Sequence, residues 1–163
     1  MRAELPPGVR FGHPAALIAT WFGVGLLPVA PGTWGSLAAL PFAWVIMQYG
    51  GVWLLAAATV VVSLLGWWAA ARYIRAHGSE DPGDIVIDEV AGQWLTLLPA
   101  GGDIGLMAAG FVLFRIADIL KPWPAGWADR EIKGGLGAMV DDLLAALWSA
   151  LAVLGLRYAF GGF

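Results

Sequence analysis

The feature that most constrains this chain is an apolar run from Val52 to Ile74, which carries no charge before Arg72. As an α-helix this run would be about 35 Å long, enough to cross the hydrocarbon core of a bilayer. A single segment in lipid must satisfy its own backbone hydrogen bonds, which favours a helix. The whole chain is 60% hydrophobic, with a mean hydropathy of +0.74. The sequence therefore predicts an all-α, polytopic membrane helix bundle.

Shorter apolar runs flank this one, separated by proline, glycine and polar stretches that break helices. We expect about five spanning helices, at residues 36–49, 52–74, 89–99, 104–120 and 138–158. The run 15–27 is only about 20 Å long as a helix, so it is expected to be re-entrant or interfacial. Loops or turns are expected at 28–36, 50–51, 75–84, 101–102 and 121–137. The expected domains are a polar N-terminal arm, 1–14, and one membrane-embedded domain, 15–163.

The distribution of charge predicts an orientation. If these helices cross the membrane in alternation, eight of the nine basic residues lie at or near one face, Arg157 being the exception. Eleven of the twelve acidic residues share that face, Asp103 being the exception. Lys and Arg are enriched on the cytoplasmic side of membrane proteins. We therefore expect a multi-pass protein whose charged face lies in the cytoplasm.

Composition excludes several classes of function. The net charge is −3 and no basic stripe is present, which argues against nucleic acid as a partner. The chain has no cysteine, which excludes disulfides, thiolate nucleophiles and cysteine metal sites. Catalysis would have to come from carboxylates, hydroxyls or the two histidines.

Charged residues interrupt the apolar runs at four sites, each within about two turns of the inner end of its segment. These sites are Asp88 with Glu89, Arg115, Asp118, and Asp141 with Asp142. Charge within a span costs roughly 2.5 to 3.5 kcal/mol per residue at the bilayer centre, so it is rarely incidental. Carboxylates that converge on one pocket repel each other unless a cation lies between them. Mg²⁺ is the natural candidate because it takes oxygen ligands, although an acidic helix cap is the simpler role for the first pair.

Basic and hydroxyl side chains near the same face could bind an anionic group. Arg115 could hold a phosphate by a bidentate fork and Lys121 as a point charge. Thr33 and Ser36 could donate hydrogen bonds to it. Simpler roles stay open, namely helix capping by Thr33 and Ser36 and an i,i+3 ion pair between Arg115 and Asp118.

Five sequence blocks follow one another along the chain: Pro31–Leu37, Ile85–Gly92, Phe114–Pro124, Asp129–Arg130 and Gly134–Asp142. In order and spacing these blocks resemble the bacterial phosphatidylglycerophosphatase A family, over nearly the whole chain from about residue 15. The resemblance implies a Mg²⁺-dependent lipid phosphatase of the bacterial inner membrane. Its substrate would be the anionic phospholipid phosphatidylglycerophosphate, whose terminal phosphate it would remove at the cytoplasmic membrane face to give phosphatidylglycerol.

The resemblance also implies roles for particular residues. The expected metal ligands, one of which could instead act as a general base, are Asp88, Glu89, Asp118, Asp141 and Asp142. Asp84 joins this set as an expected metal ligand through its place in the family's pattern. The resemblance carries Arg115 and Lys121 over as the expected basic residues of the site, and we expect them to bind the substrate. Thr33 and Ser36 are substrate-binding candidates from their hydroxyl groups alone, not from the resemblance.

Two other functions stay open at this stage. A small cation carrier or channel could use the same carboxylates as an ion pathway, but it should place charges at several depths of the bilayer. Here the outer half of the predicted bundle is almost bare of charge. A lipid phosphotransferase would share the metal and the face. Its usual Asp-Gly-x-x-Ala-Arg run is absent from the chain.

Overall fold

The structure is a computed structural model that describes residues 12–78 and 82–160. Its described part consists of helices, as expected, and has no strand. The elements in chain order are α1 (Pro14–Ala19), η1 (Val24–Leu26), α2 (Pro31–His77), α3 (Ile87–Leu97), η2 (Leu98–Ala100), α4 (Ile104–Leu120), α5 (Ala125–Glu131) and α6 (Gly134–Phe160). Most of the expected N-terminal arm, 1–14, lies outside the described residues, and Pro14 already belongs to α1.

Two of the described helices, α2 and α6, are long and apolar enough to cross a membrane, with 47 and 27 residues. Helices α3 and α4 are shorter, with 11 and 17 residues. Helix length therefore gives no support to the expected count of about five spans. It is consistent with the coarser expectation of an all-helical membrane protein.

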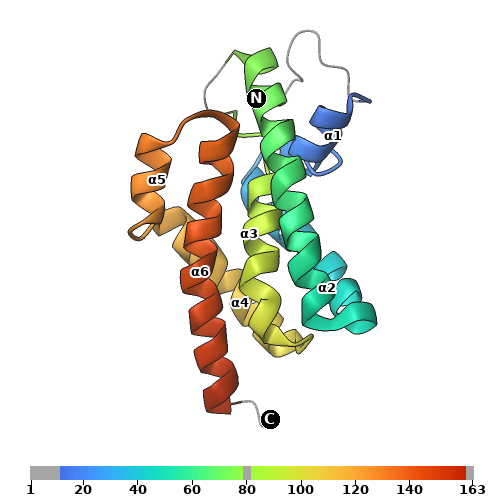
Figure 1. The fold of residues 1–163 in the computed structure, drawn as a ribbon, viewed down its shortest axis with the longest axis vertical. Helices are drawn as coiled ribbons and strands as arrows, with labels where there is room; N and C mark the ends of the chain where they lie inside the picture. The colour runs from blue at the N-terminus through green and yellow to red at the C-terminus, as the bar shows by residue number, and fades with distance from the viewer. Residues whose placement is uncertain (1–11, 79–81, 161–163) are drawn as a thin grey trace.

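Helix α2 is not straight, because it is kinked at Gly51. Gly51 has φ 63° and ψ −163°, which lies outside the helical region. Its positive φ favours glycine. At this residue the chain turns back, and the second half of α2 rises from the turn toward the opposite end of the molecule (Figure 1). The turn expected at 50–51 is thus present, and it divides α2 into two halves.

Two of the expected loops are wrong in extent. The loop expected at 28–36 ends at Ala30, because Pro31 is the first residue of α2; proline suits this position since its missing N–H would have no helical partner. Ser36 consequently lies inside the helix, where its hydroxyl donates to the Gly32 carbonyl at 3.0 Å instead of capping a helix. The loop expected at 121–137 contains α5, and α6 begins at Gly134.

Small side chains fill much of the interior, and large apolar ones face outward. Ala39, Ala69, Ala91 and Ala145 are fully buried, so neighbouring helices approach each other closely. Large side chains such as that of Trp53 are exposed. This arrangement is typical of a helix bundle surrounded by lipid.

Candidate active site

The first turn of α3 carries two carboxylates into the interior of one end of the bundle. Asp88 Oδ1 accepts a hydrogen bond from the Glu89 N–H at 3.0 Å. Just before the helix, the Val86 N–H donates to the Ala19 carbonyl at 2.9 Å, which ties the start of α3 to α1. Carboxylates in a first turn interact favourably with the positive end of the helix dipole.

Helix α6 brings a third carboxylate to this pair. Asp88, Glu89 and Asp142 each offer a carboxylate oxygen, and these oxygens lie within 4.8 Å of one another. Within these residues, Glu89 Oε2 and Asp142 Oδ2 are buried without a hydrogen-bond partner. Buried carboxylate oxygens seldom stay unpaired, and a cation between three carboxylates this close would relieve their mutual repulsion. The donor set therefore fits a hard divalent metal ion such as Mg²⁺.

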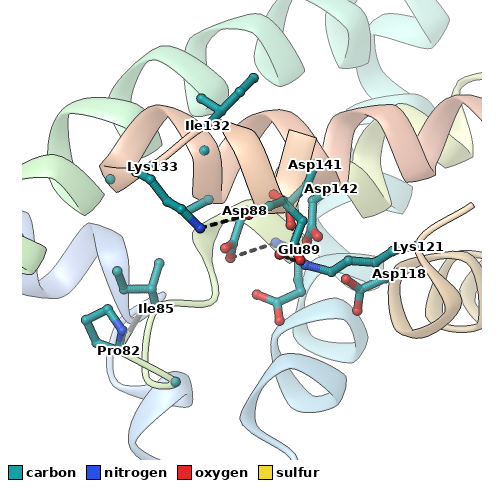
Figure 2. Close-up of a pocket in the computed structure, with 15 residues that line it drawn as sticks. Pro82, Ile85, Asp88, Glu89, Asp118, Lys121, Ile132, Lys133, Asp141 and Asp142 are labelled. Atoms are coloured by element: carbon teal, nitrogen blue, oxygen red, sulfur yellow. Dashed lines mark hydrogen bonds and ion pairs between the residues drawn. The ribbon is translucent and has the colours of Figure 1, made fainter. Parts of the chain in front are cut away.

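A cavity of about 400 Å³ opens beside these carboxylates. Its walls come from the loop before α3 and from α3, α4, α5, α6 and their connections (Figure 2). The charged residues that line it are Asp88, Glu89, Asp118, Lys121, Asp129, Lys133, Asp141 and Asp142. Six carboxylates therefore face two lysines in one cavity.

Lys121 lies between two carboxylates from different helices. Its Nζ donates to Asp141 Oδ2 at 2.5 Å and also to Asp129 Oδ1. Partial burial alone would lower the pKa of Lys121, but the hydrogen bonds to Asp129 and Asp141 and their negative charges raise it overall. The hydrogen bond from Lys121 lowers the pKa of Asp129. Lys121 thus stays protonated and fixes α4, α5 and α6 around the cavity.

Arg115 lies beside the cavity and contacts one side chain of its own helix and side chains of two other helices. Its Nη1 is 2.9 Å from Asp118 Oδ2, so the expected i,i+3 pair is present. The same nitrogen donates to Ser36 Oγ at 3.3 Å and lies 3.9 Å from Glu89 Oε1. Arg115 does not belong to the described residues that line the cavity. In this structure it connects α2, α3 and α4.

Asp84 and Thr33 do not belong to the three-carboxylate cluster. Asp84 is buried and accepts a hydrogen bond from the hydroxyl of Tyr73, a fully buried residue of α2. Thr33 lies in the first turn of α2, where its backbone N–H donates to Ala30 O at 3.0 Å. Neither residue lines the described part of the cavity.

The structure adds residues that the sequence did not single out for the site. Asp129 reaches Lys121 only because α5 folds back, and no pattern predicted α5. Gly32 leaves no room for a side chain, since a β-carbon there would overlap Glu89 Oε1. Gln93 is fully buried one turn beyond Glu89, with neither amide atom hydrogen-bonded. Asp129 and Gly32 each belong to one of the five blocks, which was a sequence signal for both, whereas Gln93 belongs to none of them.

Comparisons with known proteins identify the family that the five sequence blocks resemble. The family model described as Phosphatidylglycerophosphatase A matches residues 17–157. A protein of Escherichia coli K12 named Phosphatidylglycerophosphatase A is 42% identical over 94% of this chain and 87% of its own length. One of Haemophilus influenzae with the same name is 37% identical over 90% of each chain. A Bacteroides thetaiotaomicron protein, provisionally named a phosphatidylinositol-3-phosphatase, is 37% identical over 89% of this chain and 94% of its own.

No solved structure matches the chain. The family model covers most of the sequence, including every carboxylate of the cavity. The aligned region also covers most of the length of these two relatives. The chain therefore belongs to the phosphatidylglycerophosphatase A family.

Proposed function

We propose that this protein hydrolyses the terminal phosphate ester of phosphatidylglycerophosphate and leaves phosphatidylglycerol in the membrane. The names of two relatives support this substrate. The observation that carries the proposal is the meeting of Asp88, Glu89 and Asp142 in a cavity at one end of an apolar helix bundle. At such a place a phospholipid can keep its chains in the bilayer while its headgroup reaches the carboxylates.

Mg²⁺ is the cofactor that we assign to Asp88, Glu89 and Asp142. When bound, it would polarise the phosphoryl oxygens and offset the negative charge that develops on them. The unpartnered oxygens of Glu89 and Asp142 support this assignment. Asp118 lines the cavity next to these residues, and its pairing with Arg115 holds it in position.

We assign Asp141 as the group that accepts a proton from the attacking water. Its Oδ2 is held by Lys121, while its Oδ1 is buried without a hydrogen-bond partner. As the bond from water oxygen to phosphorus forms, this proton passes to Asp141. The bond from phosphorus to the glycerol oxygen breaks, and that oxygen takes up a proton from solvent water to become the free hydroxyl of the product, while Asp141 releases its proton to solvent.

We further propose that the cavity faces the cytoplasm. Arg72, Arg75, Arg130 and Lys133 lie at or near the cavity end of their elements, which agrees with the enrichment of basic residues on the cytoplasmic side. The two halves of α2, then α3 with η2, then α4 and α6 would make five crossings. Helix α3 is the shortest of these helices, with 11 residues. It could cross only where the bilayer is locally thinned or where the surrounding helices bury its ends.

The same distribution of charge disfavours a cation carrier. An ion pathway needs polar groups along the whole depth of the bundle. Among the described residues, the charged side chains at the end away from the cavity are Asp103 and Arg157. A one-ended site is what hydrolysis of a lipid headgroup requires.

The test of this function is phosphate release by the purified protein in detergent micelles with Mg²⁺. Phosphatidylglycerophosphate, phosphatidylinositol 3-phosphate and phosphatidic acid are compared at the same mole fraction, and the lipid products are identified. We expect phosphatidylglycerophosphate to be hydrolysed fastest and to yield phosphatidylglycerol. Absence of phosphate release from all three lipids would contradict the proposal, and a preference for the inositol lipid would change the substrate.

A further inference from the structure

The cavity has an electrostatic problem that the metal site alone does not solve. Its lining holds six carboxylates and two lysines, an excess of four negative charges in the ionised state. One divalent ion would offset two of these charges. A phosphomonoester adds about one and a half to two negative charges at neutral pH. The substrate therefore needs a cationic side chain that is not already neutralised by the protein.

The other cations near the cavity are engaged. Lys121 is held by both Asp129 and Asp141. The guanidinium of Arg115 contacts Asp118, Glu89 and Ser36, and it lies outside the cavity lining. Releasing either of them to a phosphate would leave a partly buried carboxylate without its partner, which is costly.

Lys133 differs from both of these residues. It lies in the short connection between α5 and α6, is exposed, and lines the cavity. Its Nζ donates to the backbone carbonyl of Asp129 at 3.5 Å, which is a long hydrogen bond. Besides the hydrogen bond from Lys121, its charge also helps to lower the pKa of the Asp129 carboxyl, but no ion pair joins Lys133 to another described residue. Figure 2 shows its side chain extending into the cavity toward the carboxylates.

We propose that Lys133 binds the terminal phosphate of the lipid substrate and brings it to the carboxylate cluster. This inference rests on the proposed phosphatase function and assigns within it the residue that recognises the phosphate. Lys121 then acts as a positioning residue for Asp141. A lysine at this point can follow the phosphate as it enters, because its ammonium is a mobile point charge on a flexible stem.

Kinetics on four proteins test the assignment: the wild type and the variants Lys133→Met, Lys133→Arg and Arg130→Met. Arg130 is a matched control because it is an exposed basic residue three positions away that does not line the cavity. The Arg130→Met variant measures how much a basic side chain at this surface contributes to KM merely by attracting the protein to anionic micelles. The KM and kcat for phosphatidylglycerophosphate are measured by varying its mole fraction, together with inhibition by inorganic phosphate.

We expect Lys133→Met to raise KM at least about tenfold, the scale of one lost charged hydrogen bond, with a much smaller change in kcat. Inhibition by inorganic phosphate should weaken by a similar factor. Lys133→Arg should recover most of the loss, and Arg130→Met should resemble the wild type. A KM for Lys133→Met within twofold of the wild type, or an equal rise in Arg130→Met, would overturn the assignment.

A second readout does not depend on turnover. In the Asp142→Asn variant, an amine-reactive reagent is applied with phosphatidylglycerophosphate or with phosphatidylglycerol, and labelling of Lys133 is measured by mass spectrometry. Protection by the first lipid alone supports the assignment, because the two lipids differ only in the terminal phosphate. Equal labelling with both lipids would refute it. If the wild type releases no phosphate but this protection is seen, the proposed function fails and the phosphate site stands.

Discussion

At the scale of single residues, Glu89 owes its position to the absence of a side chain at Gly32. A β-carbon at residue 32 would overlap Glu89 Oε1 and would lie 3.4 Å from Arg115 Nη1. Because the atom that must move is the end of a flexible side chain, the fold can accommodate the change while Glu89 is displaced. The first turn of α2 therefore shapes the site without contributing a ligand to it.

We predict that Gly32→Ala folds but loses about a hundredfold in kcat, since a displacement of about 1 Å at a catalytic group has this scale of effect. Phosphate release and the midpoint of unfolding in detergent are measured together. Gly155→Ala is the control, because a β-carbon there meets nothing within 4 Å. Wild-type activity in Gly32→Ala would show that the exact position of Glu89 is unimportant.

Tyr73 holds Asp84, which in turn fixes the loop that leads into α3. Both residues are buried, and the tyrosine hydroxyl donates to Asp84 Oδ2. We predict that Tyr73→Phe lowers the free energy of unfolding by about 1.5 to 3 kcal/mol, because a buried carboxylate loses a hydrogen bond. The Mg²⁺ concentration needed for half-maximal activity should not change. Tyr49→Phe is the control, since Tyr49 is exposed and its change should lie within about 0.5 kcal/mol.

If Asp84 were instead a metal ligand, loosening it would alter the response to Mg²⁺. A shifted Mg²⁺ dependence in Tyr73→Phe, with unchanged stability, would therefore contradict a purely structural role for the hydrogen bond between Tyr73 and Asp84.

The sequence predicted some of these contacts and not others, for a physical reason. The Arg115 and Asp118 pair follows from helical spacing alone. The contact of Lys121 with Asp129, and that of Gly32 with Glu89, depend on how separate helices meet. No local pattern encodes such contacts.

At the scale of elements, the start of α6 packs directly on α2. A β-carbon on Gly135 would overlap the backbone of Ala71, lying 2.7 Å from its Cα. The backbone of a packed helix cannot move cheaply, in contrast to the end of a side chain. This contact holds the helix that carries Asp141 and Asp142 against the rest of the bundle.

We predict that Gly135→Ala destabilises the protein by about 1 to 3 kcal/mol through overpacking. Gly155→Ala, in the same helix, should be neutral or stabilising by up to about 1 kcal/mol because alanine is the better helix former. Both values are measured by denaturant titration in micelles. Equal stability of the two variants would contradict the close approach of α6 and α2.

Helix positions were more predictable than helix ends. The limits of α4, 104–120, follow from the sequence because Gly101 and Gly102 precede the helix and Lys121 and Pro122 follow it. The start of α2 was predicted too late, since Pro31 and Gly32 indicate a loop unless proline is the first residue of the helix. Helix α5 was missed because its seven residues lie in a polar stretch rich in proline and glycine.

At the scale of the whole molecule, the two ends of the bundle differ in chemistry. The cavity and its carboxylates lie at the end where α3 and α6 begin, and the described chain finishes at the other end (Figure 1). Exposed apolar side chains cover the surface between them, including Val60, Leu64 and Leu151. This polarity suits an enzyme that acts on lipid headgroups from one side of a membrane.

The natural absence of cysteine makes the proposed orientation easy to test. Single cysteines are introduced as Glu131→Cys, at the cavity end, and Asp103→Cys, at the other end, both exposed sites. We predict that a membrane-impermeant maleimide labels Asp103→Cys in spheroplasts and Glu131→Cys only in inverted vesicles. Labelling of both from one side would mean that α4 does not cross the membrane.

The measurement that tests the account most directly is a Mg²⁺ titration of phosphate release from phosphatidylglycerophosphate, with the wild type and Asp142→Asn. Asp142 is buried and supplies the α6 oxygen of the three-carboxylate cluster. The wild type should release no phosphate in chelator and should saturate with Mg²⁺, whereas the variant should need at least about tenfold more Mg²⁺ or stay inactive. Release in chelator equal to that with Mg²⁺, or identical titrations for the two proteins, would contradict a metal site at Asp88, Glu89 and Asp142.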